Sequence, residues 1–429
     1  MKTVKQGSQG TFVSYVQLAL SRLGYPVIMD EIFGPATNEA VRSFQSVNGL
    51  TVDGIVGQKT WEALLPILRG YSYYTIKKGD TFNKIAQDYG TTVEKIISAN
   101  PTAVPERLSI GEIIIVPYGF SLVPTNVAYT YFLTKLIIEG IQVRFPIIKT
   151  GSAGSSVMGN NLYYLVIGQG NNEVFYNGAH HANEWITTPL LLRFLEEYAE
   201  AYYRNENIYT YSAVDLFNAT TLYMIPLVNP DGVDLVNEGI SVESTYYAQA
   251  ESIARNYPDI PFPDGWKANI IGIDTNLSYP AYWEQAREIK FAQGYTSPAP
   301  RDYVGTAPLS AKESALVYQF TTERNFLLSF SYHTQGKVIY WKFLDYMPEN
   351  AGEIGEMLSA ASGYTIEDTP YSSSFAGYKD WYIMTYNRPG YTIEAGSGIN
   401  PLPIEQFPEI YKDNVGILAV GLGVFIGML

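Results

Sequence analysis

Beyond about residue 119, apolar segments of strand length alternate along the chain with segments of helix length. The strand candidates are residues 162–167, 173–176, 221–225, 326–332, 337–340 and 390–394. Between them lie helix candidates such as 189–203 and 311–323. This alternation is typical of a mainly parallel or mixed sheet with helices on both faces. We therefore expect residues 119–429 to form one α/β domain.

Residues 1–68 follow a different pattern and predict a small three-helix module. Apolar side chains recur at helical spacing in three segments, and turn residues fill 30–35 and 52–57. The motif Asp-x-x-Phe-Gly-Pro-x-Thr beginning at Asp30, the pair Phe44-Gln45, and Asp-Gly-x-x-Gly before Trp61 complete the pattern. Together they resemble the peptidoglycan-binding domain of bacterial wall hydrolases.

Residues 71–118 predict a second small unit with the order strand, helix, helix, strand. The first strand runs into a turn at Asp80-Thr81, and either residue suits the N-cap of the next helix. The segment 108–117 closes the unit as a strand. This βααβ order resembles a LysM domain, which implies binding to glycans that contain N-acetylglucosamine.

Composition narrows the partners and the possible metal sites. The chain has no cysteine, so disulfides and thiolate metal sites are excluded, and a metal must use histidine and carboxylate. The net charge of -14 falls almost entirely after residue 118, which argues against nucleic acid as a partner.

Hydropathy gives no reason to expect membrane insertion. The first residues lead into no apolar signal segment, and the apolar run 415–429 is too short to cross a bilayer. We expect that run to be a C-terminal helix packed on the core. The resemblance of the two N-terminal modules to wall-binding domains implies a location at the cell wall or the spore, without an evident export route.

Two of the three histidines lie in the segment 178–185, where His181 and Glu184 have His-x-x-Glu spacing. At that spacing both side chains can lie on one side of a short helical turn. His333, far downstream, would complete a three-ligand shell with one position open, the pattern of a catalytic zinc. On this segment alone, a surface turn with a hydrogen-bonded core histidine is the alternative.

Four landmarks then follow one another in a fixed order: 181–186, 228–232 with 272–276, 331–333, and 391–394. In order and spacing they resemble the zinc carboxypeptidase family over about residues 120–429. The resemblance implies one zinc ion per chain, held by His181, Glu184 and His333. It also implies that Glu394 takes a proton from zinc-bound water and returns it to the leaving amine.

Two further residues near these landmarks have less certain roles. His180, beside the first ligand, is expected to be structural rather than a fourth ligand. Lys267 stands where the family has an arginine that stabilises the oxyanion, and it could supply that charge or be a solvated lysine.

The chain departs from the family where the substrate binds. Asn276 matches the family's asparagine, but Leu277 replaces the arginine that completes the clamp on a terminal carboxylate. Lys379 aligns with the floor of the specificity pocket, where a lysine calls for an anionic group. Tyr371 lies one position from the family's mobile tyrosine.

Arg301 and Arg388 are further candidates for binding carboxylates, although a surface or structural role is equally open for each of these charges. Together, the resemblances to the zinc carboxypeptidase family and to two wall-binding domains imply a zinc metallopeptidase that hydrolyses the γ-D-Glu–diaminopimelate bond of stem peptides and binds peptidoglycan glycan strands. The alternatives are a metallocarboxypeptidase that trims C-terminal residues and a non-catalytic wall-binding protein.

Overall fold

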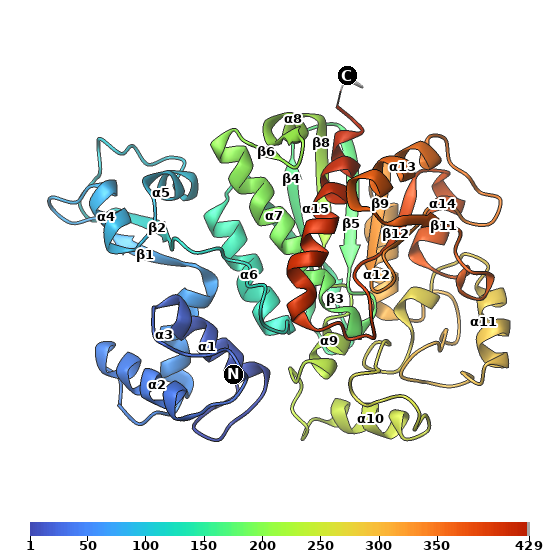
Figure 1. The fold of residues 1–429 in the computed structure, drawn as a ribbon, viewed down its shortest axis with the longest axis horizontal. Coiled ribbons are helices and arrows are strands. Elements are labelled where there is room, and N and C mark those ends of the chain that lie inside the picture. The colour runs from blue at the N-terminus through green and yellow to red at the C-terminus, as the bar shows by residue number, and fades with distance from the viewer. Residues whose placement is uncertain (427–429) are drawn as a thin grey trace. The chain divides into compact units, whose positions relative to one another are not determined.

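The structure is a computed structural model that describes residues 1–426 (Figure 1). Its contacts divide the chain into two compact units. One comprises residues 1–128 and 132–147, and the other residues 129–131 and 148 onward. None of the helices in the described part of the chain combines the length and apolar character needed to span a bilayer.

The first unit begins with three helices, as predicted: α1 (Thr11–Arg22), α2 (Pro35–Val47) and α3 (Gln58–Arg69). Two buried glutamines fix the loops that join them. The amide of Gln17 donates to the Asp30 carboxylate at 2.8 Å, and the amide of Gln45 donates to Asp53 at 2.9 Å. The Asp30, Gln45 and Asp53 side chains of the sequence motif, together with Gln17, therefore hold the loops of this module in place.

The LysM-like part has the predicted βααβ order, with β1 (Tyr71–Thr75), α4 (Phe82–Asp88), α5 (Val93–Ala99) and β2 (Ile113–Pro117). The two strands pair antiparallel. Thr81 is the N-cap of α4, since its side chain accepts a hydrogen bond from the Lys84 N–H at 3.2 Å. Asp80 instead accepts from the Lys77 N–H at 2.7 Å and closes the preceding turn.

Helix α6 (Tyr131–Arg144) packs largely with the three-helix module. The ring of Phe132 lies 5.9 Å from that of Phe12 and 6.3 Å from that of Trp61. Arg69 forms an ion pair with Glu139 at 3.3 Å. The boundary expected at residues 118 and 119 thus falls inside this packing unit, and a chain cut there would uncover α6.

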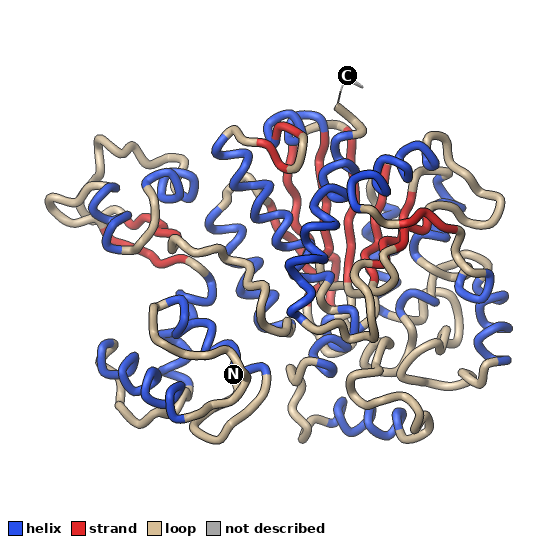
Figure 2. Tube along the Cα trace, in the orientation of Figure 1, coloured by secondary structure: helices blue, strands red, loops and turns tan. Residues whose placement is uncertain are grey.

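The second unit is built on a mixed sheet, shown in red between the helices in Figure 2. In chain order its eight strands are β3 (Lys149–Ser155), β4 (Asn161–Gly168), β5 (Asn172–Gly178), β8 (Thr220–Ile225), β9 (Leu328–His333), β10 (Val338–Tyr340), β11 (Thr365–Glu367) and β12 (Gly390–Glu394). Across the sheet the order is β11-β10-β12-β9-β5-β8-β4-β3. A separate hairpin joins β6 (Asn207–Ile208) to β7 (Tyr211–Ser212).

Nine helices of this unit lie within the described residues: α7 (Thr187–Arg204), α8 (Ala213–Ala219), α9 (Pro230–Val236), α10 (Thr245–Ala254), α11 (Trp283–Ala292), α12 (Lys312–Thr322), α13 (Ala351–Ser362), α14 (Tyr378–Tyr386) and α15 (Phe407–Gly423). Four short 3-10 helices add η1 (Ala182–Glu184), η2 (Thr275–Leu277), η3 (Tyr371–Ser373) and η4 (Ile404–Gln406). The predicted C-terminal helix corresponds to α15, while residues 427–429 of the predicted run lie outside the described residues.

Helices cover both faces of the sheet, as predicted. Successive side chains of a strand point to opposite faces. The ring of Phe175 on β5 meets Phe320 of α12 at 5.4 Å and Tyr378 of α14 at 5.9 Å. On the other face the hydroxyl of Tyr176 donates to the Leu418 carbonyl of α15 at 2.9 Å, where α15 and α7 lie side by side (Figure 1).

Three neighbouring strands carry the sequence landmarks to one edge of this sheet. β9 pairs parallel with both β5 and β12, so the carboxyl ends of all three lie together. β5 ends three residues before His181, whereas His333 and Glu394 are the last residues of β9 and β12. Ligands of open α/β sheets bind at this edge.

Candidate metal centre

His181 and Glu184 owe their common direction to the short helix η1. The Glu184 N–H donates to the His181 carbonyl at 3.2 Å, and the Ala182 N–H donates to the Lys267 carbonyl at 3.0 Å. In a 3-10 helix, side chains three residues apart are eclipsed. The His-x-x-Glu spacing therefore places both side chains on one side, as expected from the sequence.

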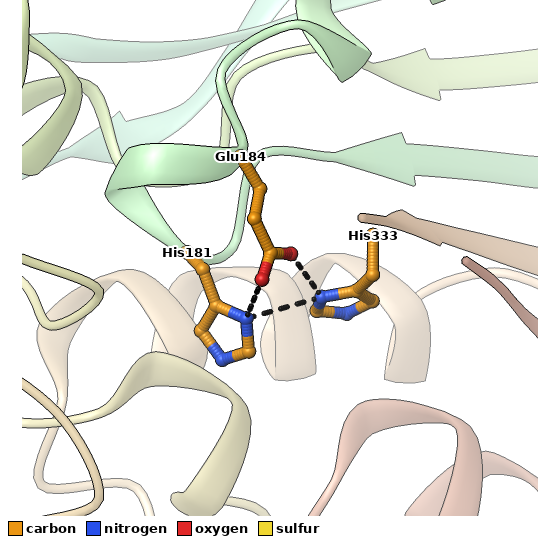
Figure 3. A group of neighbouring side chains, drawn as sticks. All are labelled: His181, Glu184 and His333. Atoms are coloured by element: carbon orange, nitrogen blue, oxygen red, sulfur yellow. Dashed lines mark hydrogen bonds and ion pairs between the residues drawn. The ribbon is translucent and has the colours of Figure 1, made fainter. Parts of the chain in front are cut away.

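The side chains of His181, Glu184 and His333 converge on one point (Figure 3). Glu184 Oε1 lies 3.0 Å from His181 Nδ1, and Glu184 Oε2 lies 2.8 Å from His333 Nδ1. The two Nδ1 atoms are 3.2 Å apart. Tetrahedral bonds to zinc of about 2.0–2.1 Å keep neighbouring ligand atoms about 3.3 Å apart. Two imidazoles and a carboxylate at this spacing fit a zinc ion.

Asp274 contacts His181 through the ring nitrogen that faces away from the other two side chains. Its Oδ1 lies 3.2 Å from His181 Nε2, and its Oδ2 accepts from the Asp302 N–H at 3.1 Å. Burial acts to raise the pKa of Asp274, but the charge and hydrogen bond of His181 outweigh it and hold the pKa well below its usual range. Carboxylates placed in this way fix the orientation and tautomer of metal-binding histidines.

Asp274 was expected only as part of a landmark, with no role of its own. Asn400 was missed altogether. Its Nδ2 donates to Glu184 Oε1 at 3.3 Å and to the Thr334 carbonyl at 2.8 Å. An aspartate between Gly272 and Asn276 was a usable signal, whereas nothing around Asn400 in the sequence marks it.

Glu394 lies next to His333, its register partner on the neighbouring strand. No described residue donates a hydrogen bond to its carboxylate. Burial, reinforced by the charge of Glu184, raises the pKa of Glu394 to about 8. A carboxyl group that holds a proton this readily is suited to accepting and releasing one near neutral pH.

The two basic residues whose roles were left open by the sequence, Lys267 and His180, lie in different surroundings. The Lys267 ammonium lies 2.9 Å from Glu184 Oε1, inside the centre rather than in solvent. His180 is fully buried, and its Nε2 lies 3.0 Å from the Tyr279 hydroxyl, while its carbonyl accepts from Thr275 Oγ1 at 2.6 Å. His180 is thus tied to the protein core and lies outside the convergent group.

The centre opens into a pocket of about 670 Å³. The predicted substrate-binding residues Asn276, Lys379 and Arg301 all line it. Asn276 Nδ2 lies 3.3 Å from His333 Nε2, and its Oδ1 accepts from the Tyr378 N–H at 3.0 Å. Tyr371 does not line the pocket; it is 64% exposed, and its ring packs on Phe375.

Lys379, for which binding of an anionic group and a structural role were both open, has partners within the protein. Its ammonium donates to the Lys342 carbonyl at 2.7 Å and to Thr369 Oγ1 at 3.0 Å, and it pairs with Asp380 at 2.9 Å. Both charged side chains are 4% exposed. The lysine is therefore neutralised by its own neighbour.

Arg388 also has a local role, because it donates to the Phe326 carbonyl at 2.6 Å and to Asn325 Oδ1 at 2.9 Å. These contacts tie the segment before β12 to the segment before β9, at the opposite end of the strands from the metal centre.

Comparison with known proteins agrees with this geometry. The profile of the zinc carboxypeptidase family matches residues 136–416. The chain belongs to the zinc carboxypeptidase family. It is accordingly a zinc metallopeptidase, and further profiles match a peptidoglycan-binding domain at residues 9–64 and a LysM domain at residues 74–117.

Individual relatives point the same way. Gamma-D-glutamyl-L-diamino acid endopeptidase 1 of Lysinibacillus sphaericus is 40% identical over 68% of this chain and 72% of its own length. The uncharacterized protein YqgT of Bacillus subtilis strain 168 is 37% identical over 64% of this chain and 72% of its own. Bovine thrombin-activatable fibrinolysis inhibitor, solved with a tick carboxypeptidase inhibitor, shares the fold with a TM-score of 0.54 at 18% identity, covering 71% of this chain and 99% of that one.

Proposed function

We propose that this peptidase hydrolyses the bond between γ-D-glutamate and diaminopimelate in the stem peptides of peptidoglycan. The relative that is 40% identical is named for a γ-D-glutamyl-L-diamino acid bond. One zinc ion per chain would be held by His181, Glu184 and His333, whose donor atoms all lie within 4.8 Å of one another.

The main support for an endopeptidase is the side chain at position 277. Leu277 lines the pocket beside Asn276 and packs against a buried apolar cluster. A terminal carboxylate placed there would meet hydrocarbon instead of the forked guanidinium that binds carboxylates with two parallel hydrogen bonds. The demand for a free C-terminus is thereby removed, which disfavours the carboxypeptidase alternative.

The residues around the metal centre have different roles in hydrolysis. When bound, zinc supplies a water that is acidic enough to lose a proton near neutral pH. Glu394 takes the proton of the attacking water and delivers it to the leaving amine. Lys267, whose ammonium lies 2.9 Å from Glu184, brings positive charge for the carbonyl oxygen that becomes negative.

The two N-terminal domains would hold the enzyme on its substrate. The peptidase part carries the acidic charge of the chain, so electrostatic attraction to an anionic wall is not available. Linked binding modules raise the local concentration of a catalytic domain to about the millimolar range when linkers are short. Glycan strands and stem peptides of peptidoglycan are therefore the expected partners.

The decisive experiment is mass spectrometry of the products from defined tri-, tetra- and pentapeptide stems, each with a free and with an amidated C-terminus. The proposal expects cleavage at the γ-D-Glu–diaminopimelate bond in every stem, with or without amidation, and none with Glu394→Gln. Removal of single C-terminal residues that amidation blocks would identify a carboxypeptidase. Zinc-loaded protein that binds sacculi but releases no peptide would be a wall-binding protein only.

A further inference from the structure

On one wall of the pocket, two cationic side chains form ion pairs with the same carboxylate. Lys290 of α11 pairs with Asp302 Oδ1 at 2.6 Å, and Arg301 Nε pairs with Asp302 Oδ2 at 2.7 Å. The side chains of Lys290 and Asp302 are 11% and 15% exposed, whereas that of Arg301 is 41% exposed. All three line the pocket.

On this wall two cations share the carboxylate of Asp302, and the charge of Asp274 also acts on Arg301. Lys379 faces Asp380 at 2.9 Å and has that carboxylate to itself. Lys267 lies 2.9 Å from Glu184, a carboxylate that also contacts both histidines of the metal centre. Asp302 must serve two. Among residues 1–426, Arg301 uses only its Nε on a protein acceptor, which leaves the Nη1 and Nη2 groups for another anion.

The same wall is fixed rigidly to the metal centre. The Asp302 N–H donates to Asp274 Oδ2 at 3.1 Å, and Asp274 Oδ1 contacts His181 Nε2 at 3.2 Å. The Pro300 carbonyl accepts from the N–H groups of Lys267 and Ala268 at 2.8 and 2.9 Å. Asp302 has a φ of 64°, a left-handed conformation that is uncommon for a residue with a side chain and persists where surrounding bonds impose it.

We propose that Arg301 binds a carboxylate of the substrate, and that Asp302 and Lys290 position it. With Leu277 in place of the family's arginine, a substrate carboxylate needs positive charge elsewhere in the pocket, and Arg301 is the cation with unused donors. The inference rests on the proposed function and adds to it the residue that binds a charged group of the substrate. The stem peptide offers two such groups, the α-carboxylate of γ-D-Glu and a carboxylate of diaminopimelate.

The test compares wild type with Arg301→Gln on three soluble peptides: L-Ala-γ-D-Glu-diaminopimelate, the same peptide with the γ-D-Glu α-carboxylate amidated, and the same peptide with the diaminopimelate carboxylates amidated. A charge-assisted hydrogen bond is worth about ten- to a hundredfold in kcat/KM, so the variant should lose that much on the free acid. On the analogue that lacks the carboxylate bound by Arg301, variant and wild type should be nearly equal. On the other analogue the loss should persist, which identifies the bound group.

Arg287→Gln is the matched control, because Arg287 lies on α11, is exposed, and stacks on Phe291 outside the pocket lining. It removes the same charge and should leave all three substrates unaffected. Zinc content and thermal unfolding should be unchanged in both variants. No loss on the free acid, or an equal loss on all three peptides, would overturn the assignment of Arg301.

Lys290 tests the positioning role separately. Without Lys290, Asp302 would neutralise Arg301, so Lys290→Met should raise KM for the free acid with the same dependence on amidation, and Lys290→Arg should restore it. If Lys290→Met fails to fold, Arg301→Gln still decides the inference. Wild type that leaves the γ-D-Glu–diaminopimelate bond intact would refute the proposed function itself, whereas cleavage without the Arg301 pattern would refute this inference alone.

Discussion

Lys379 and Arg301 are cations that line the same pocket, yet their charges are balanced in opposite ways. Lys379 has a buried aspartate and two further oxygens to itself, while Arg301 shares one aspartate with Lys290. The first arrangement satisfies a charge inside the protein, and the second leaves charge for a ligand. A cation in a pocket therefore indicates binding only after its counterion has been counted.

Glu394 is the clearest case of an ionisable group left without a hydrogen-bond partner in the described part of the protein, and its replacement should have the largest effect. We expect Glu394→Gln to lower kcat on stem peptides by about 10²–10⁴-fold, because a positioned acid–base group contributes that much. Zinc content and the thermal unfolding midpoint should stay at or above wild type, since a buried carboxyl group with no hydrogen-bond donor does not stabilise the fold. A kcat within a few-fold of wild type would remove Glu394 from the chemistry.

Lys379→Met should affect stability rather than selectivity. Removing one member of a buried ion pair costs about 3–5 kcal/mol, because the other charge stays buried without compensation. Chemical denaturation should measure this loss, and Lys379→Met/Asp380→Asn should recover most of it. Equal stability of the single variant and wild type, together with lost preference for acidic over amidated peptides, would instead make Lys379 the selective cation.

The same contrast separates what could and could not be predicted from the sequence. The mixed sheet with helices on both faces and the two small N-terminal domains were predicted correctly, because apolar periodicity and turn residues are local signals. Strand β3 was missed since its sequence Lys-Thr-Gly-Ser-Ala-Gly-Ser has little β-propensity, and β11 is only three residues long.

For the site, the order of the landmarks was enough to bring His181, Glu184 and His333 together. The counterions of Lys379 could not be predicted in the same way. The Lys342 carbonyl and Thr369 reach it only through tertiary packing, and nothing in the local sequence says that Asp380 turns toward Lys379 rather than solvent. Asn400 was missed for the same reason, and the roles assigned to individual site residues stay predictions.

Asp234 extends the comparison to a buried carboxyl group that has no cation to pair with among the described residues. Its Oδ1 accepts from the Tyr131 N–H at 2.6 Å, and no ion pair to it occurs within residues 1–426. Burial raises the pKa of Asp234 to about 7; the Tyr131 N–H opposes this rise, and the charge of Asp231 adds to it. Because the folded-state pKa is raised, the protonated form is favoured on folding, and this contribution is lost as pH rises from about 4 to about 7.

Asp234→Asn should therefore flatten part of the pH dependence of stability. At about 1.4 kcal/mol per pH unit, the free energy of unfolding of wild type relative to the variant should fall by up to about 4 kcal/mol between pH 4 and pH 7 and stay constant above. Denaturant titrations of both proteins across that range measure the difference. A difference that is independent of pH would mean that Asp234 keeps its ordinary pKa in the folded protein.

The smallest expected effect distinguishes the wall-binding domains from the catalytic unit. Deleting residues 1–118 would be ambiguous, because Phe132 of α6 packs on Phe12 and Trp61 and would be exposed. Competition with soluble N-acetylglucosamine oligomers keeps the chain whole. These oligomers should slow digestion of insoluble sacculi several-fold, because tethering raises the enzyme concentration only there, and should change kcat/KM on soluble stem peptides by less than about twofold. Glucose oligomers of equal length, which lack the N-acetyl groups, should do neither. Equal inhibition of hydrolysis of both substrates would place a glycan-binding site in the catalytic pocket itself. There the uncharged sugar would compete with the stem peptide for the residues that bind the peptide's charged groups.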